Sequence, residues 1–372
     1  MRVCRSCLMP NTRPGLTFDD DGICYPCRHK SAVTETIDWD ERLNQIKEIG
    51  AWGRANSSNG YDCVIGVSGG KDSMRQALLA RDELGLKPLL VCLSYPPQQQ
   101  NDIGPANLSN LIALGFDCMT VNLSPRTWGL AMRKSFFKYA NWCKSTEMAL
   151  YTSSVRVGIE MGIPLILLGE NNALVYGDTS MGADGGDASR INRNNTLGGG
   201  QSDWLTCPEI PANKLLWYGF PDTQEVTDAN LRMIFLGYYF PDFDIYTNAR
   251  IAIENGLTVR ENDPDKFGTL NNFEDLDEDF VPVNQYLKFL KFGFSRVTDE
   301  VCEYIRNGDL TREEGKDLIK KYDGKCAPEL ITRFCKFIEV SEDEFWSVAE
   351  DCRNPDIWER DNQDGWVLVR DF

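Results

Sequence analysis

The sequence contains a single histidine, His29, among its 372 residues. Catalytic triads of the Ser-His-Asp and Cys-His types use a histidine as general base, so they are excluded unless His29 itself serves. Metal sites that need two or more histidine ligands are excluded outright. The scarcity of histidine therefore removes most hydrolase chemistry and most histidine–metal chemistry.

Basic residues and long apolar runs are also scarce. The chain has 39 Lys and Arg against 56 Asp and Glu, a net charge of −17, which argues against a nucleic-acid partner because such partners are held mainly through basic contacts to phosphate. The apolar run 164–168 is far too short to cross a bilayer. The first residues lack the apolar stretch of a secretory signal. We therefore expect a cytoplasmic protein without a membrane or nucleic-acid partner.

The order of apolar segments predicts an α/β core. At ~150 residues per domain the length suggests two or three domains, and we place them at residues 1–55, 56–240 and 241–372. In the middle part, short apolar strands alternate with segments of helical spacing. The expected strands are 63–67, 88–94, 116–121 and 164–168, and the expected helices are 73–84, 107–114, 128–142 and 148–161. This alternation predicts a parallel sheet covered by helices on both faces.

Four other segments stand out by composition. The glycine-rich stretch 177–200 predicts a long surface loop, either a lid or a poorly ordered connection. Residues 261–280 hold eight acids against one lysine, and residues 341–372 hold ten acids against three arginines; we interpret both as solvated faces without a catalytic role. Beyond residue 240 the pattern is helical, and Thr311–Glu314 forms a capping box at the start of one such helix.

Four cysteines form two CxxC pairs near the start of the chain. Sixteen residues separate the pair Cys4 and Cys7 from the pair Cys24 and Cys27. A CxxC turn lets two thiolates reach one ion, and two such turns complete a tetrahedral Zn–S4 shell with no open position. The spacing therefore predicts a structural zinc site, with a redox pair or chance spacing as the alternatives.

The segment Ser68–Ser73 reads Ser-Gly-Gly-Lys-Asp-Ser and lies between an expected strand and an expected helix. Glycines let a backbone close around an anion, and the amides of the following helix point at it. The segment is not a Walker A loop, because the first required glycine is missing and Asp72 replaces the Mg²⁺-binding Ser or Thr. The alternative is an ordinary glycine turn.

This segment resembles the SGGxDS loop of the PP-loop ATP pyrophosphatases, whose core is the adenine nucleotide alpha hydrolase-like fold. The resemblance implies that ATP is bound and cleaved to AMP and pyrophosphate. Phosphate contacts are then assigned to Ser68, Gly69, Gly70, Asp72 and Ser73. Lys71 would add positive charge and Asp72 would position Mg²⁺, so these two are the candidate catalytic residues.

Two other strand ends complete the expected nucleotide site. Ser94 and Tyr95 would flank the adenosine. Gly169 and Glu170 follow the fourth expected strand, at the edge of the sheet where ligands gather in open parallel sheets. Glu170 is our candidate for a second Mg²⁺ ligand, the alternative being a loop carboxylate without a role.

Motifs in all three parts of the chain resemble the N-acetyl sugar amidotransferases of bacterial surface-glycan pathways. They include the opening segment 4–15, the segment 20–24, Gly169–Asn171, Lys291–Arg296 and Thr311–Gly315. Some members of this family amidate nucleotide-linked diacetamido-mannuronic acid for lipopolysaccharide O-antigen, and others amidate precursors of flagellar sugars. The resemblance implies an amidotransferase in which an acetamido oxygen attacks the α-phosphorus of ATP, and ammonia then displaces AMP to leave an acetamidino group.

The source of ammonia follows from the missing histidines. A class I glutaminase needs a Cys-His-Glu triad, and the only histidine lies in the expected zinc segment. Arg2 follows Met1, so an amino-terminal cysteine nucleophile is absent too. The resemblance implies a separate glutaminase partner, similar to the pair that feeds imidazole glycerol phosphate synthesis, with a channel for ammonia between the proteins.

The more basic section 285–325 offers cations for the diphosphate of a nucleotide sugar, because Arg presents a bidentate fork to phosphate. We favour a substrate or partner contact for Lys291 and Arg296. We interpret Lys288, Arg306 and Arg312 as scaffold residues.

Two other functions are compatible with these motifs. Some tRNA thiolases join an SGGxDS loop to zinc knuckles, but they usually need a reactive cysteine pair and a basic face. The nine remaining cysteines contain no further CxxC, and we expect Cys63, Cys92 and Cys118 to be buried in strands. The other possibility is a subunit that binds nucleotide without catalysis. The motifs do not name the sugar or its nucleotide carrier.

Overall fold

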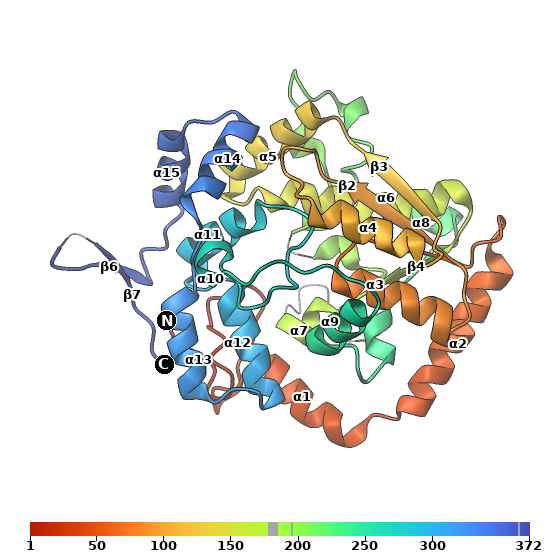
Figure 1. The fold of residues 1–372 in the computed structure, drawn as a ribbon, viewed down its shortest axis with the longest axis horizontal. Coiled ribbons are helices and arrows are strands. Elements are labelled where there is room, and N and C mark those ends of the chain that lie inside the picture. Colours follow the sequence, from red (N-terminus) through yellow and green to blue (C-terminus); the bar gives the residue numbers. More distant parts are fainter. Residues whose placement is uncertain (178–184, 195, 364) are drawn as a thin grey trace.

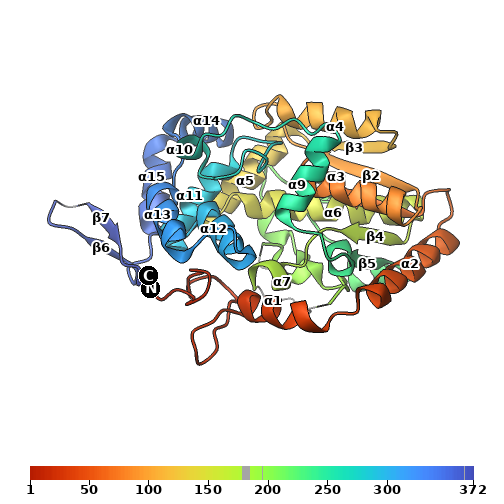
Figure 2. The same cartoon turned by 60° about the horizontal axis from the view of Figure 1, so that its bottom comes forward.

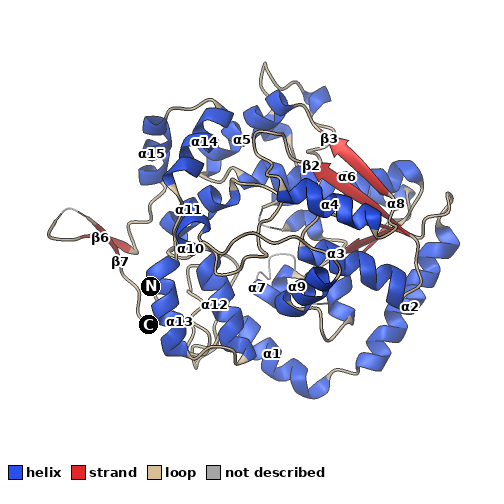
Figure 3. Cartoon of the chain, in the orientation of Figure 1, coloured by secondary structure: helices blue, strands red, loops and turns tan. Residues whose placement is uncertain are grey.

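The computed structural model describes residues 1–177, 185–194, 196–363 and 365–372. A five-stranded parallel sheet lies on one side of the molecule, on the right in Figures 1 and 3, with the C-terminal helices on the other side. The strand order is β3-β2-β1-β4-β5. The strands are β1 (Cys63–Gly66), β2 (Pro88–Ser94), β3 (Cys118–Asn122), β4 (Leu165–Leu168) and β5 (Arg232–Phe235). The predicted α/β class and all four predicted strands are confirmed, and β5 is an addition.

Alternate side chains of the strands point to opposite faces, and each face is covered. On one face Ile65 and Leu167 pack in a core with side chains of α2 (Trp39–Asn56), α3 (Lys71–Leu78) and α9 (Ile245–Glu254). On the other face Val64 and Ile166 pack in a core with side chains of α6 (Cys143–Met161). The sheet is therefore buried on both sides, as its short uninterrupted apolar strands predict.

Helix boundaries differ from the expected ones by a few residues. The helix after the glycine loop starts two residues early, as α3, and its last turn is the π-helical segment Leu79–Glu83. The next two are α4 (Ile103–Ala113) and α5 (Pro125–Tyr139), the latter with Pro125 in its first turn, where the missing N–H costs no bond. All four expected helices of this part are present.

The edges of the sheet depart most from expectation. β3 is an edge strand whose side chains are half-buried or exposed, so Cys118 is half-buried and its predicted full burial is wrong. Cys63 and Cys92 are buried as predicted. The unpredicted β5 has only four residues and follows the short helix α8 (Thr223–Asp228). Its first residue, Arg232, is exposed and the other three are buried, so the segment shows neither alternation nor a continuous apolar run, and it becomes a strand by pairing with β4.

The C-terminal part is helical and lies beside the carboxyl ends of the strands (Figure 2). Its helices are α10 (Pro264–Phe267), α11 (Val281–Phe292), α12 (Arg296–Asn307), α13 (Arg312–Tyr322), α14 (Pro328–Ile338) and α15 (Glu342–Asp351). The predicted capping box at Thr311 and Glu314 is confirmed. An aromatic core that includes Phe136 of α5, Phe334 of α14 and Phe345 of α15 joins this part to the sheet domain.

A two-stranded hairpin follows α15 and consists of β6 (Trp358–Arg360) and β7 (Trp366–Leu368). Beyond it the last residues return to the first: the N–H of Asp371 donates to the carbonyl of Met1 at 3.0 Å (Figure 1). In the part of the chain that the structure describes, none of the helices combines the length and apolarity needed to span a membrane.

The N-terminal segment packs against the C-terminal helices. Its four CxxC cysteines share a buried cluster with Val297, Val301 and Cys302 of α12 and Ile319 of α13. Arg312, at the start of α13, donates to the carbonyl of Cys4 at 2.7 Å. Helix α1 (Tyr25–Thr36) follows and contacts α7 (Asn172–Tyr176). Residues from both ends of the sequence thus flank the sheet domain together.

Candidate functional site

The glycine loop lies between β1 and α3, as predicted, and its conformation depends on glycine. Gly69 has a φ of 88°, in the left-handed region, and a Cβ there would lie 3.0 Å from the backbone nitrogen of Leu108 in α4. The hydroxyl of Ser73 donates to the carbonyl of Gly70 at 3.0 Å, and the hydroxyl of Ser68 accepts from the N–H of Gly70 at 3.3 Å. The loop is therefore a tight turn that presents the first amides of α3.

A first cavity of about 380 Å³ opens beside this loop, at the carboxyl ends of β1, β2 and β4. The chain runs from β1 outward to β3 and then crosses to β4 on the other side of β1. Open parallel sheets bind ligands at such a switch point, where neighbouring loops leave in opposite directions. The residues that line it are Gly66, Val67, Ser68, Asp72, Ser73, Gln76, Val91, Leu93, Glu147, Leu150, Tyr151, Ser153, Ser154, Leu167, Leu168, Gly169, Glu170 and Phe235.

Five of the predicted nucleotide-site residues line this cavity, namely Ser68, Asp72, Ser73, Gly169 and Glu170. Ser94 is not among them, and its hydroxyl lies 3.5 Å from the carbonyl of Tyr95. Tyr95 makes an edge contact with the ring of Trp128. The predicted roles of Ser94 and Tyr95 beside an adenosine therefore stay predictions.

Asp72 and Glu170 bring two carboxyl groups to the same cavity from α3 and from the turn after β4. Burial and the nearby charge of Asp72 raise the pKa of Glu170 to about 8. Asp72 accepts hydrogen bonds from Lys71 at 2.8 Å and from Asn248 at 3.0 Å. Carboxylate oxygens that repel one another across a cavity are a donor set that a hard divalent cation satisfies, so these residues fit Mg²⁺.

Lys71 is not among the residues that line the first cavity, and its ammonium is held between two carboxylates. Its ammonium lies 2.8 Å from Asp72 and 2.7 Å from Glu274, and the residue is 4% exposed. Burial alone would lower the pKa of Lys71, but the charges of Asp72 and Glu274 outweigh it and raise that pKa well above its ordinary value. Lys71 therefore stays charged and links the glycine loop to the C-terminal part of the chain.

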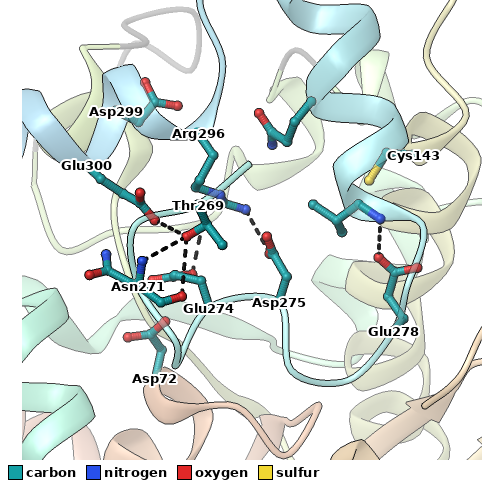
Figure 4. A network of polar contacts seen from close by, with 12 residues as sticks. Asp72, Cys143, Thr269, Asn271, Glu274, Asp275, Glu278, Arg296, Asp299 and Glu300 are labelled. Carbon is teal, nitrogen blue, oxygen red and sulfur yellow. Dashed lines mark hydrogen bonds and ion pairs between the residues drawn. The ribbon is translucent and has the colours of Figure 1, made fainter. Parts of the chain in front are cut away.

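The partner of Lys71 belongs to the acidic run 261–280, whose predicted solvation is wrong for its second half. Glu274 and Glu278 are 7% and 1% exposed. Glu278 accepts from Gln99 at 2.8 Å and from the N–H of Phe280 at 2.7 Å. Each of these two acids is buried beside a partner from a distant part of the sequence, Lys71 for Glu274 and Gln99 for Glu278. Figure 4 shows how Glu274 and Asp275 approach Arg296 at the start of α12.

A second cavity, also of about 380 Å³, shares Glu147, Tyr151 and Glu170 with the first. Its wall comes from all three predicted parts of the chain. The residues that line it are Arg13, Pro14, Asn141, Glu147, Tyr151, Glu170, Tyr176, Asn194, Thr196, Asn284, Gln285, Lys288, Lys291, Phe292, Phe294, Arg296 and Asp299. The two cavities therefore meet at Glu170, one of the predicted cation ligands.

The cations of the basic section separate into two groups. Lys291 and Arg296, which we expected to contact a substrate or partner, line the second cavity, and so does Lys288, which we took for a scaffold residue. Arg306 and Arg312 instead contact the cysteine segment, at the Sγ of Cys7 and the carbonyl of Cys4. Sequence reasoning had no signal for Glu147, which lies in an ordinary helix, or for Arg13 as a wall residue.

The glycine-rich stretch 177–200 is described only in part. Residues 178–184 and 195 lie outside the described residues. In the rest of the stretch, short 3₁₀ turns lie at Ile191–Arg193 and Gly198–Gly200, and Ile191 and Leu197 are buried against the sheet, so this part is a packed connection and the role as a lid stays a prediction. Asn194 and Thr196 contribute to the wall of the second cavity. The side-chain amide of Asn171 donates to the carbonyl of Gly185 at 2.9 Å, which brings this stretch close to the turn after β4.

The four CxxC cysteines are brought together as predicted. All are buried, and their sulfur atoms lie within 4.8 Å of one another. Backbone N–H groups of Ser6 and Cys24 donate to the Sγ of Cys4, each at 3.3 Å, as thiolates in CxxC turns require. Four sulfurs with satisfied outer contacts have the chemistry and spacing of a closed tetrahedral metal site, so the cluster can hold a zinc ion.

Replacing Glu274 by glutamine is expected to destabilise the fold by about 2 kcal/mol. Removing one partner of a buried ion pair typically costs about 3–5 kcal/mol, and Lys71 keeps Asp72 as a second partner. Urea unfolding measures the change, and Glu329→Gln is the control because its ion pair with Lys266 is exposed and long, at 3.8 Å. Equal unfolding midpoints for Glu274→Gln and the control would contradict this assignment.

Comparisons with known proteins give one family match. Residues 264–372 match the family model described as LPS biosynthesis protein WbpG-like, C-terminal domain. No curated protein matches the chain. Among solved structures, the NMN synthetase from Francisella tularensis aligns with 61% of this chain and 100% of its own, at 14% identity and a TM-score of 0.27, a likeness too weak to carry an argument. The family match relates the C-terminal helices, which supply Lys288, Lys291 and Arg296 to the second cavity, to proteins of lipopolysaccharide biosynthesis.

Proposed function

We propose that this protein is an ATP-dependent amidotransferase of lipopolysaccharide or related surface-glycan synthesis. Its substrate would be a sugar, such as a nucleotide-linked acetamido sugar, whose acetamido group it converts into an acetamidino group. The observation that carries the proposal is the junction of the two cavities at Glu147, Tyr151 and Glu170. One cavity contains the SGGxDS loop that resembles the ATP pyrophosphatases, and the other has cations from the domain matched to lipopolysaccharide biosynthesis.

In this proposal ATP binds in the first cavity with its pyrophosphate end toward the glycine loop. Its pyrophosphate end would lie against Ser68, Ser73 and the first amides of α3, where a helix N-terminus favours anions. The apolar residues Val91, Leu93 and Leu168 at the strand ends offer a surface for the adenosine. The α-phosphorus would then face the junction with the second cavity, where an acceptor oxygen can approach it.

Asp72 and Glu170 would hold Mg²⁺, which when bound neutralises the charge that develops on the departing pyrophosphate. The residues of the chain hold the reacting groups in position. The loop amides and the hydroxyl of Ser68 would donate to phosphate oxygens, which lowers the barrier most when the donors need no rearrangement, while the hydroxyl of Ser73 keeps its bond to the carbonyl of Gly70. The fixed turn at Gly69 provides that preorganisation.

The reaction has two steps in this proposal. The acetamido oxygen forms a bond to the α-phosphorus of ATP and pyrophosphate leaves, giving an adenylated imidate. Ammonia then adds to the activated carbon, AMP leaves with the former acetamido oxygen, and one proton is released. An amide carbon is a poor electrophile, and a phosphate ester of its oxygen is a good leaving group, which explains why ATP is consumed.

The test measures which nitrogen source the purified chain accepts. We expect AMP and pyrophosphate to form with Mg-ATP, an acetamido-sugar nucleotide and ammonium chloride, and glutamine to give no product unless a glutaminase partner is added. The reason is that His29, the sole histidine, lies next to the cysteine cluster and not near the two cavities. UDP- and CMP-linked acetamido sugars are assayed in parallel, with mass spectrometry of the product.

Three outcomes would contradict parts of the proposal. If no acetamido sugar stimulated AMP formation, the amidotransferase assignment would be wrong. If AMP formed with bulk tRNA and a sulfur donor instead, the chain would be a tRNA thiolase. Substantial glutamine hydrolysis by the chain alone would refute the need for a partner.

A further inference from the structure

Three basic side chains, Arg13, Lys288 and Arg296, line the second cavity, and the first two share one carboxylate. Arg13, from the cysteine segment, and Lys288, from α11, both pair with Asp299 of α12, the latter at 2.8 Å. All three side chains are largely buried, with exposures of 11%, 21% and 10% respectively. Arg296 lies on the same helix as Asp299 and pairs with Asp275 at 2.9 Å (Figure 4).

Basic residues outnumber acidic ones in the wall of the second cavity. The basic ones are Arg13, Lys288, Lys291 and Arg296, and the acidic ones are Glu147, Glu170 and Asp299. Burial, followed by the charges of Arg13 and Arg296, lowers the pKa of Lys288 well below its ordinary value. An anion bound in the cavity would favour the charged form of Lys288 and offset the repulsion among these cations.

Hydrogen-bonding capacity in the wall of the cavity is also unused. The Nε of Arg296 and the Oδ1 of Asn284 are buried and have no hydrogen-bond partner among the described residues. Both residues line the second cavity. A buried polar atom without a partner costs free energy, and such atoms are commonly satisfied by a bound ligand.

Aromatic rings fix the cations in place. The guanidinium of Arg13 lies 4.6 Å from the ring centre of Phe294 and 5.3 Å from that of Tyr176, and the ammonium of Lys288 lies 4.5 Å from that of Phe294. These contacts hold charged groups at the cavity wall without neutralising them. The cluster is therefore preorganised for an anion.

The cysteine segment is what places Arg13 there. Arg13 follows the second cysteine by six positions, its N–H donates to the carbonyl of Pro10 at 3.2 Å, and its Nε lies 3.1 Å from the Sδ of the fully buried Met9. The N–H of Cys4 donates to the carbonyl of Met9 at 2.8 Å. The turn that gathers the cysteines thus also sets the position of Arg13.

We propose that Arg13, Lys288 and Arg296 bind an oxyanion of the acceptor, a phosphate or a carboxylate, and that the cysteine segment serves this binding by holding Arg13 in the second cavity. The inference rests on the proposed function for the identity of the acceptor. Arg and Lys side chains form the same kind of charge-assisted hydrogen bonds with the phosphates of a nucleotide diphosphate and with the carboxylate of a sugar acid.

Calorimetric titration of the full zinc-loaded chain tests this assignment. The first cavity is saturated with Mg²⁺ and a non-hydrolysable ATP analogue, and UDP, glucuronate and the neutral N-acetylglucosamine are titrated separately. We expect one oxyanion to bind saturably, and Arg13→Gln and Lys288→Gln each to weaken it by about tenfold, as expected for the loss of a charge-assisted contact. Tighter binding of UDP assigns the cluster to a diphosphate, and tighter binding of glucuronate assigns it to a sugar carboxylate.

Asp299→Asn distinguishes a role of these cations in oxyanion binding from a purely structural role, because the two roles predict opposite changes in oxyanion affinity. Removing this carboxylate leaves the cations with less competition, so we expect the oxyanion to bind several-fold more tightly. The charge-matched control is Lys336→Gln, because Lys336 lines a different cavity, between α5 and α14. The control is expected to leave binding unchanged.

The outcomes also separate this inference from the proposed function. Absence of saturable binding by both oxyanions, unchanged binding in Arg13→Gln, or weaker binding in Asp299→Asn would overturn the inference. If the oxyanion binds as expected but no acetamido sugar supports AMP formation, the proposed function fails and the oxyanion site stands. In the active enzyme, Arg13→Gln is expected to raise the KM for the acceptor about tenfold and to leave the KM for ATP unchanged.

Discussion

Asp72→Asn is expected to lower the rate of acceptor-dependent AMP formation by about 10²–10³-fold. Asp72 is the only residue of the glycine loop that brings a carboxylate to the first cavity, where it faces Glu170. Asparagine keeps the size of the side chain and one oxygen that can accept from Asn248, but it loses the charge that a Mg²⁺–pyrophosphate group needs. Steady-state release of pyrophosphate measures the effect.

A matched control is Asp82→Asn, in the π-helical turn that continues α3. Asp82 pairs with Arg81 at 2.6 Å on the surface, so its loss removes one acid from the same helical segment without touching the cavity. Circular dichroism and urea unfolding of both variants exclude a folding defect as the cause. Activity of Asp72→Asn within about threefold of wild type would exclude the carboxylate from charge stabilisation, since even one lost donor usually costs about 10²-fold.

The sheet and the loop could be predicted because their signals are local. A strand such as Leu165–Leu168 is continuous and apolar, and the loop Ser68–Ser73 combines glycines and hydroxyls at the point where a strand becomes a helix. The CxxC pairs are local too, and the structure gathers their four sulfurs. In each case the residues that define the feature are neighbours in the sequence, so one window contains the whole pattern.

The burial of the acidic segment could not be predicted in this way. Glu274 is buried because Lys71 and Arg296 approach it from two other parts of the chain, and no window of sequence contains all three. Composition alone favours a solvated face for such a run, and that is the usual outcome. The position of Asp277 also depends on a distant residue, Gly104 of α4. A Cβ at position 104 would lie 2.8 Å from the Cα of Asp277, so only glycine there lets the acidic segment lie this close to α4.

The second cavity escaped prediction for the same reason. Lys291 and Arg296 were singled out as substrate or partner contacts, but Arg13 is more than 270 positions away from them in the sequence, and Lys288 lies at an ordinary position of an amphipathic helix. The cavity exists because the cysteine segment packs on α12 and α13. A motif that reads as a local metal site therefore also decides how distant parts of the chain meet.

Loss of a zinc ion from the four-cysteine cluster is expected to lower the stability of the fold strongly. Cys24→Ser, or prolonged treatment with a strong chelator, should lower the free energy of unfolding by at least about 3 kcal/mol. The reason is that metal binding at a structural site of four cysteines contributes directly to folding. Without the metal the four thiols bind protons and lose the metal–sulfur bonds that hold the two CxxC turns together, so the cluster would loosen and release the contacts of Val297 and Val301 with it. The first cavity lies on the sheet domain and should still bind the ATP analogue.

Cys352→Ser is the control for this experiment, because Cys352 is half-buried at the end of α15 and lies outside the four-cysteine cluster. Metal analysis should give one zinc per wild-type chain and per control chain, and less in Cys24→Ser. Limited proteolysis should then cut first within residues 1–30, since that segment depends on the ion for its packing, while the sheet domain resists. A chain that holds no zinc, or one whose unfolding is the same with and without it, would show that the cysteines pack as ordinary thiols and that contacts such as those with Phe294, Tyr176 and Asp299 position Arg13 without a metal.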